Sequence, residues 1–127
     1  METTISCGPQ FAENVNISGS KFHNVNLSGS DFDNVNLSNT RFHDISMSNI
    51  KVSAVNLGGA TFQHLGPPPD KDGNWPRQRP VLFEEAMLCD SVFRMVDLSN
   101  VRIENCNIEG MTIDGVLVSD LLEKFNS

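Results

Sequence analysis

Three side chains of this 127-residue sequence carry the groups of a nucleophilic site: the thiol of Cys89, the imidazole of His64 and the carboxylate of Asp90. A thiol nucleophile needs a neighbouring base and a third group that orients the base, all within hydrogen-bond reach. Nothing in the pattern of the sequence requires these three groups to converge. We therefore predict a protein that is not an enzyme, with no catalytic residues, no cofactor-binding residues and no cofactor.

A bound cation is the second chemistry to consider. His23 and His43 lie twenty residues apart at matching places, which should bring them close enough on one face for a surface ion. A structural or catalytic metal site needs three or four ligands, and Gln63 is a poor third. The three cysteines lack CxxC or Cys/His spacing, which argues against a zinc site and a disulfide framework. We expect no metal, two solvated histidines and free thiols.

A five-residue repeat positions these side chains. A large apolar residue, called the central residue, recurs at every fifth position on both sides of one interruption. The central residues are Ile17, Phe22, Leu27, Phe32, Leu37, Phe42, Met47, Val52, Leu57, Phe62, Phe83, Leu88, Phe93, Leu98, Ile103, Ile108, Ile113 and Val118. Two residues earlier, a small partner accompanies most Phe residues and Val accompanies most Leu residues, which matches volumes in a narrow core.

Turn-forming residues stand two places after most central residues. They are Gly19, Asn24, Gly29, Asn34, Asn39, Asp44, Asn49, Gly59, Asp90, Asn100, Asn105, Gly110 and Gly115. Gly, Asn and Asp are the residues that tolerate a positive φ. Each five is therefore predicted to be a short extended piece that ends in a corner.

If the fives wind into coils with one five on each face, the period of the repeat sets the number of faces in a coil. Phe and Leu alternate with period ten, which requires two or four faces, and Lys21 matches Arg41 but not Asp31, which favours four. Residues twenty apart would then stack. We expect an aromatic ladder of Phe22, Phe42 and Phe62, an aliphatic ladder of Ile17, Leu37 and Leu57, and an outer amide column of Asn16, Asn36 and Asn56.

Fives such as VNLSG, SDFDN, VNLSN and ATFQH resemble the A(D/N)LXX repeats of the pentapeptide-repeat family, over nearly all of residues 15–120. The resemblance implies an all-β fold, a right-handed quadrilateral β-helix of about five coils. Its handedness rests on the resemblance alone. To this we add a 16-residue insertion loop, Leu65 to Pro80, and a short C-terminal helix.

We expect a single domain. Its parts are an N-terminal cap over residues 1–14, coils over 15–64, the insertion loop over 65–80, coils over 81–118 and a C-terminal cap helix over 119–127. Apolar residues from Leu117 to Phe125 have helical spacing, and Asp120 with Glu123 resembles a capping box. The helix covers the last coil or forms a homodimer seam, as the family often pairs its C-terminal ends.

Acidic side chains concentrate after the loop. Residues 1–64 carry three basic and five acidic side chains, whereas residues 81–127 carry three and nine. The candidate acidic face consists of Glu84, Glu85, Asp90, Glu104, Glu109 and Asp114. Such a surface repels nucleic acid and suits a basic protein partner, or it only keeps the solenoid soluble.

The insertion loop is the candidate interaction loop. Structureless loops of this length are uncommon in compact domains and are often functional. Trp75, the only Trp, lies beside Arg77 and Arg79, residue types enriched at binding hot spots, and Lys71 adds a third cation. Alternatively, Trp75 folds back over the coils and pins the loop.

These features predict a non-enzymatic protein-interaction or scaffold module with an unknown protein partner. The resemblance implies an alternative, a DNA-mimicking binder of DNA gyrase or topoisomerase IV, like the Qnr-type fluoroquinolone-resistance proteins. No apolar run reaches eighteen residues, and residues 1–10 lack the features of a signal peptide. We expect a cytoplasmic protein that contacts neither membrane nor nucleic acid directly.

Overall fold

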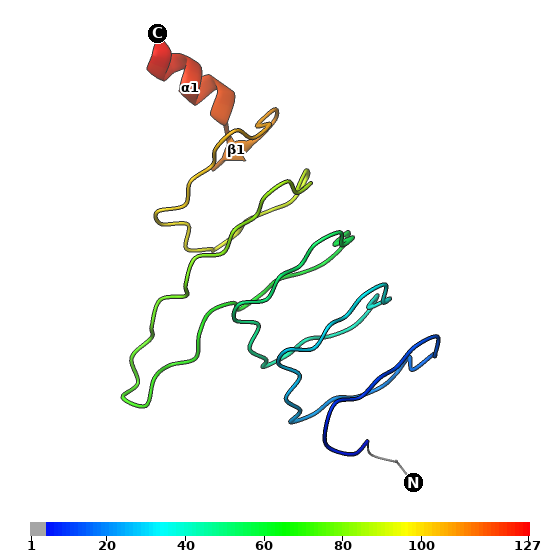
Figure 1. Cartoon of the computed structure of the whole chain (residues 1–127). Coiled ribbons are helices and arrows are strands. Elements are labelled where there is room, and N and C mark those ends of the chain that lie inside the picture. The colour runs from blue at the N-terminus through cyan, green and yellow to red at the C-terminus, as the bar shows by residue number, and fades with distance from the viewer. Residues whose placement is uncertain (1–4) are drawn as a thin grey trace. The chain divides into compact units, whose positions relative to one another are not determined.

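The computed structural model describes residues 5–127 (Figure 1). The start of the predicted N-terminal cap, residues 1–4, lies outside the described residues. Contacts divide the chain into two units, Met1–Gly59 and Ala60–Ser127, and each is treated by itself. The expectation of a single domain over residues 1–127 stays a prediction.

The first unit is built from hydrogen-bonded corners that recur every ten residues. At each, the carbonyl of a central residue accepts a hydrogen bond from the N–H three residues later, and the residue before that N–H has a positive φ, as in a type II turn. The pairs are Ile17 with Ser20, Leu27 with Ser30, Leu37 with Thr40 and Met47 with Ile50, at 3.1–3.2 Å. The Phe/Leu alternation of the sequence therefore has a counterpart in the backbone.

A second kind of corner lies between these turns. The chain bends at Asn24, Asn34, Asp44 and Ala54, with φ of 54–55° and no such hydrogen bond among the residues described. All thirteen predicted turn formers, in both units, have φ between 53° and 81°. The prediction of a positive φ two residues after the central residue is confirmed. Because open and hydrogen-bonded corners alternate, the backbone pattern repeats every ten residues.

Asparagine side chains brace several of the corners that follow Ile17, Leu37 and Leu57. The Oδ1 atoms of Asn16, Asn36 and Asn56 each accept the backbone N–H two residues later, at 2.8–3.0 Å. This is an Asx turn, in which a side chain takes the place of a backbone acceptor. The predicted amide column of these residues is not formed, because among the residues described each amide bonds only within its own corner and none bonds to another of the three.

Successive turns of the chain, called windings, are not joined by backbone hydrogen bonds among residues 5–111. The predicted aromatic and aliphatic ladders are not formed: Phe22 and Phe42 are both 56% exposed, and no described side chain is buried. The chain exposes 13,940 Å², whereas a compact monomer of this mass would expose roughly 6,700 Å². The central residues keep their spacing, but their apolar surfaces stay open to solvent.

In the second unit, the insertion loop interrupts the order of corners in a regular way. The bends after Phe62 and Phe83 are both open, at His64 and Glu85, so the loop stands where a hydrogen-bonded corner would fall. Hydrogen-bonded corners resume at Leu88, Leu98 and Ile108. The loop thus takes the place of one regular corner after Leu65.

The regular corners end at Met111, before the predicted coil boundary at 118. Strand β1 (Thr112–Ile113) pairs antiparallel with β2 (Val116–Leu117), with Thr112 opposite Leu117. The linking residues Asp114 and Gly115 both have a positive φ, as in a type I′ hairpin turn. The prediction that regular fives continue through residue 118 is wrong, because an Asp-Gly pair between extended residues favours a hairpin.

Helix α1 (Val118–Asn126) follows β2 and contacts it, which confirms the predicted C-terminal helix. The capping-box prediction is wrong: the N-cap residue is Leu117 and makes no side-chain hydrogen bond. Asp120 lies in the first turn instead, where its charge complements the partial positive charge of the helix N-terminus.

Candidate functional site: the insertion loop

The tip of the insertion loop is closed by Asp70. Its Oδ1 atom accepts the N–H groups of Asp72 and Asn74 at 2.9 and 2.8 Å, and its own N–H donates to the Asn74 carbonyl at 2.7 Å. Gly73 adds a bond to the Asp70 carbonyl and has φ of 82°. The tip is therefore a defined turn that presents Lys71.

The exit of the loop is tied to the winding that follows. Arg77 donates from Nη2 to the Ser99 Oγ atom at 3.2 Å. Ser99 belongs to a corner in which Asp97 Oδ1 accepts the Ser99 N–H at 2.9 Å, the arrangement that asparagine forms in the first unit. The loop is thus held at its tip and near its exit.

The carboxylate at this attachment is tuned by its neighbours. The pKa of Asp97 is lowered, first by the hydrogen bond from the Ser99 side chain, then by the Ser99 backbone N–H, with a smaller effect of the Arg77 charge. Each of these stabilises the ionised carboxylate. Asp97 therefore stays ionised at neutral pH and supports both the corner and the loop.

The other candidate loop residues remain available for contact. Trp75 is 74% exposed, and Lys71 and Arg79 are exposed as well. Of the four residues predicted from the sequence, Arg77 alone has a hydrogen-bond partner elsewhere in the second unit. The Trp75 side chain is therefore not buried against the coils.

The predicted acidic residues are spread over successive fives. Glu84, Glu104 and Glu109 directly follow central residues, whereas Glu85, Asp90 and Asp114 have a positive φ at corners. Glu104 forms an ion pair with Arg102 at 3.5 Å, and both side chains are largely exposed. Such a pair contributes at most about 1 kcal/mol. The residues form an exposed acidic stretch rather than a convergent site.

The residues considered for catalysis and metal binding do not assemble. His64 and Asp90 each occupy a positive-φ corner, and within residues 5–127 no hydrogen bond joins them to Cys89. The three cysteines are free and exposed. Across the same residues, no group of three potential ligands is placed to hold a metal ion.

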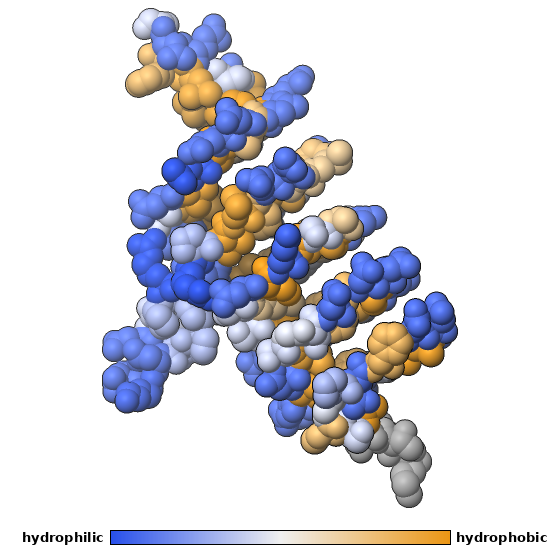
Figure 2. Space-filling model, in the orientation of Figure 1, coloured by the Kyte–Doolittle hydropathy of each residue, from blue (hydrophilic) through white to orange (hydrophobic). Residues whose placement is uncertain are grey.

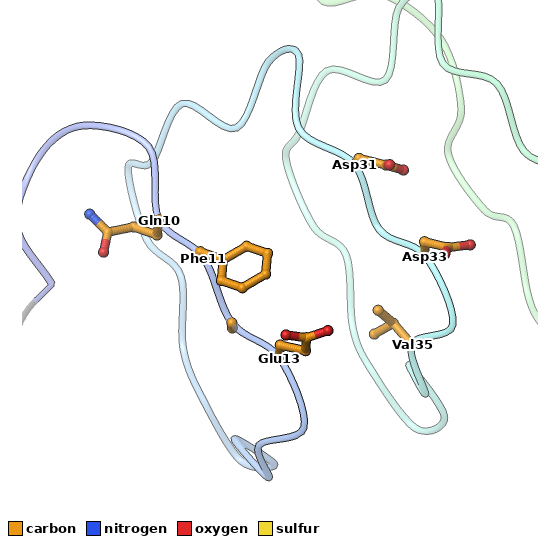
Figure 3. Close-up of a pocket in the computed structure, with 7 residues that line it drawn as sticks. Gln10, Phe11, Glu13, Asp31, Asp33 and Val35 are labelled. Atoms are coloured by element: carbon orange, nitrogen blue, oxygen red, sulfur yellow. The ribbon is translucent and has the colours of Figure 1, made fainter.

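A cavity of about 460 Å³ lies between the first two windings and is lined by Gln10, Phe11, Ala12, Glu13, Asp31, Asp33 and Val35 (Figure 3). Phe11 and Glu13 point toward Val35, whereas the carboxylates of Asp31 and Asp33 point away from Phe11. The lining pairs residues twenty apart, Phe11 with Asp31 and Glu13 with Asp33, which supports the four-face period. Only the Glu13 carboxylate points into this cavity, so the cavity does not form a cation site.

Four outward apolar residues were not singled out in the sequence analysis. Leu82, Met87 and Val92 each directly precede a central residue, and Met95 occupies a corner. They are 72% to 101% exposed. Figure 2 shows apolar and polar surface intermixed along the windings. The signal was present in the sequence, because the residue before the central one is polar in every five from Asn16 to Thr61.

Helices in the described part of the chain include none with the length and apolar content that a membrane span needs. Residues 8–51 match a family model described as pentapeptide repeats (9 copies). This stretch of the chain is therefore made of pentapeptide repeats, for which a β-helix is the implied fold. Comparisons with curated proteins and with solved structures gave no significant match.

Proposed function

We propose that this chain is a non-enzymatic protein-interaction or scaffold module, and that the insertion loop is its principal contact. The supporting observation is a loop closed by Asp70 and tied by Arg77 that leaves Trp75 exposed. An ordered loop loses less conformational entropy on binding than a flexible one. A large aromatic side chain beside exposed cations suits a protein hot spot.

The acidic stretch supplies a second surface. Exposed carboxylates from Glu84 to Asp114 attract a basic partner and speed its approach. The exposed apolar residues of α1, including Phe125, provide a third surface, through which a homodimer could form at the C-terminal end. The loop ranks first because it combines defined geometry with an exposed anchor residue.

The second candidate function is DNA mimicry toward DNA gyrase or topoisomerase IV. It is favoured by the exposed acidic stretch together with a projecting loop, the two features that the Qnr-type resemblance implies. The nearly balanced charge of residues 1–64 favours it less, because a DNA mimic needs negative charge along its length. In this proposal the protein binds the enzyme and not DNA.

Affinity capture on the immobilised full chain tests the first proposal. We expect a protein that the wild type and Lys51→Ala retain and that Trp75→Ala loses. Lys51 is a matched control, since it is exposed and lies outside the loop. If every captured protein is indifferent to Trp75→Ala, the loop is not the principal contact.

A gyrase supercoiling assay, with and without a fluoroquinolone, tests the second candidate. DNA mimicry predicts inhibition, or protection from the drug, that weakens in Trp75→Ala. If excess protein affects neither the supercoiling nor the drug, DNA mimicry of gyrase is excluded.

A further inference from the structure

The outward apolar residues Leu82, Met87, Val92 and Met95 are called here the apolar belt. Their exposure of 72% to 101% exceeds the 38% to 63% of the central residues from Phe83 to Ile103. Closing the windings onto one another would cover the central residues and their inward partners. It would leave the belt uncovered, because the belt occupies outward positions.

The repeat itself does not require an apolar belt. The residues that precede the central residues before the loop are Asn16, Lys21, Asn26, Asp31, Asn36, Arg41, Ser46, Lys51, Asn56 and Thr61. All are polar, so the change to Leu82, Met87 and Val92 begins directly after the loop. Exposed apolar side chains in water gain free energy when a partner covers them.

Charges of both signs flank the start of the belt. Lys71 and Arg79 lie on the loop, and Glu84 and Glu85 follow Leu82. In the described part of the chain the one ion pair joins Arg102 and Glu104, so these four charges have no ionic partner within it. A cationic aromatic loop thus adjoins an anionic apolar segment in the same unit.

We propose that the loop and the start of the belt form a two-fold contact with a second copy of this chain. In a two-fold contact the same surface meets itself, so each loop faces the other copy's belt. Trp75 would pack on Leu82 and Met87 of the second copy, while Lys71 and Arg79 face Glu84 and Glu85. Charge complementarity selects this occupant, because a uniformly acidic or basic partner would meet like charge on half of the surface.

This inference rests on the proposed interaction role and names the partner. Sedimentation velocity of the full chain over a wide concentration range tests it at low and high salt. We expect a dimer whose Kd weakens severalfold at high salt, where charge attraction is screened. A chain that stays monomeric at every concentration overturns the inference. If that monomer still captures another protein through Trp75, the proposed function stands.

Charge exchange makes the test specific to the surface. Arg79→Glu and Glu84→Arg should each weaken the dimer severalfold, and the double variant should restore it because both symmetric contacts then carry exchanged charges. Lys51→Glu is the control, with the same change of charge at an exposed position outside the loop and the belt, and circular dichroism checks the fold of every variant. A dimer that Phe125→Ser dissociates and the charge variants leave intact would place the contact at α1 and overturn the inference.

Discussion

The guanidinium of Arg77 and the hydroxyl of Ser99 are joined by a hydrogen bond of 3.2 Å that links the insertion loop to the winding beyond it. Asp97 accepts the N–H of Ser99 in the same corner. A residue of the interaction loop therefore serves to hold the loop, while Trp75 and Arg79 remain exposed.

Arg77→Ala should release the exit of the loop. We expect lower fluorescence anisotropy of Trp75 and faster proteolysis within residues 65–80. The free energy of unfolding should change by less than about 1 kcal/mol, as for other exposed polar contacts. Arg79→Ala is the control, since Arg79 has no hydrogen-bond partner among those described. Equal effects of the two substitutions would show that the Arg77 contact does not hold the loop.

Acid should release the loop through Asp97. Its pKa is lowered in the folded chain, chiefly by the Ser99 hydroxyl. A group with a lowered pKa stabilises the fold above its ordinary pKa, about 3.9 for Asp, and the contribution is lost as the pH falls through the lowered value. Trp75 anisotropy should therefore drop below about pH 4. In Asp97→Asn this transition should be absent, and its persistence would assign it to another carboxyl group.

Asn36→Ala should destabilise the first unit by about 0.5 to 1.5 kcal/mol, since the Ser38 N–H loses its acceptor. Asn36→Asp should be nearly neutral, because aspartate fills the same role at Asp97. Ser38→Ala keeps the N–H and is the matched control. Urea unfolding gives these differences, and an Asn36→Ala variant as stable as Ser38→Ala would contradict the Asx turn.

Ala54→Asn should stabilise the chain by about 0.5 to 1 kcal/mol. Ala54 has φ of 55°, a conformation that is unfavourable for alanine and better tolerated by asparagine. Ser53→Asn, at the neighbouring exposed residue without a positive φ, should give no gain. The comparison of urea midpoints decides, and equal midpoints for the two variants would show that the corner carries no strain.

Phe42→Ala measures how far the windings close. The β-helix that the repeat family implies buries such a residue, and we expect a loss of about 3 to 5 kcal/mol. A side chain that stays half exposed, as Phe42 is in the structure, would lose only about 1 kcal/mol. The smaller value, measured by urea unfolding, would mean that the windings remain open in solution.

Features that depend on the conformational preferences of neighbouring residues were predictable from the sequence. Features that depend on which distant residues contact one another were not. The backbone preferences of Gly19 and Asn24 are enough to predict corners at these residues. The helical spacing of the apolar residues is enough to predict α1. The β1–β2 hairpin was missed because Gly115 also fits the repeat, and the stronger signal was the Asp-Gly pair. The contact of Arg77 with Ser99 was out of reach, because the loop breaks the spacing that relates distant residues.

The alternation of corner types restricts how the gene for such a chain can lengthen or shorten. Removing five residues would place two open corners, or two hydrogen-bonded ones, in succession and turn every later Phe toward the wrong side. Duplication or loss of ten residues preserves the order, and twenty also preserve the face. The loop follows this rule by substituting for a single corner between Phe62 and Phe83. Insertions and deletions that preserve the fold should therefore be multiples of ten residues.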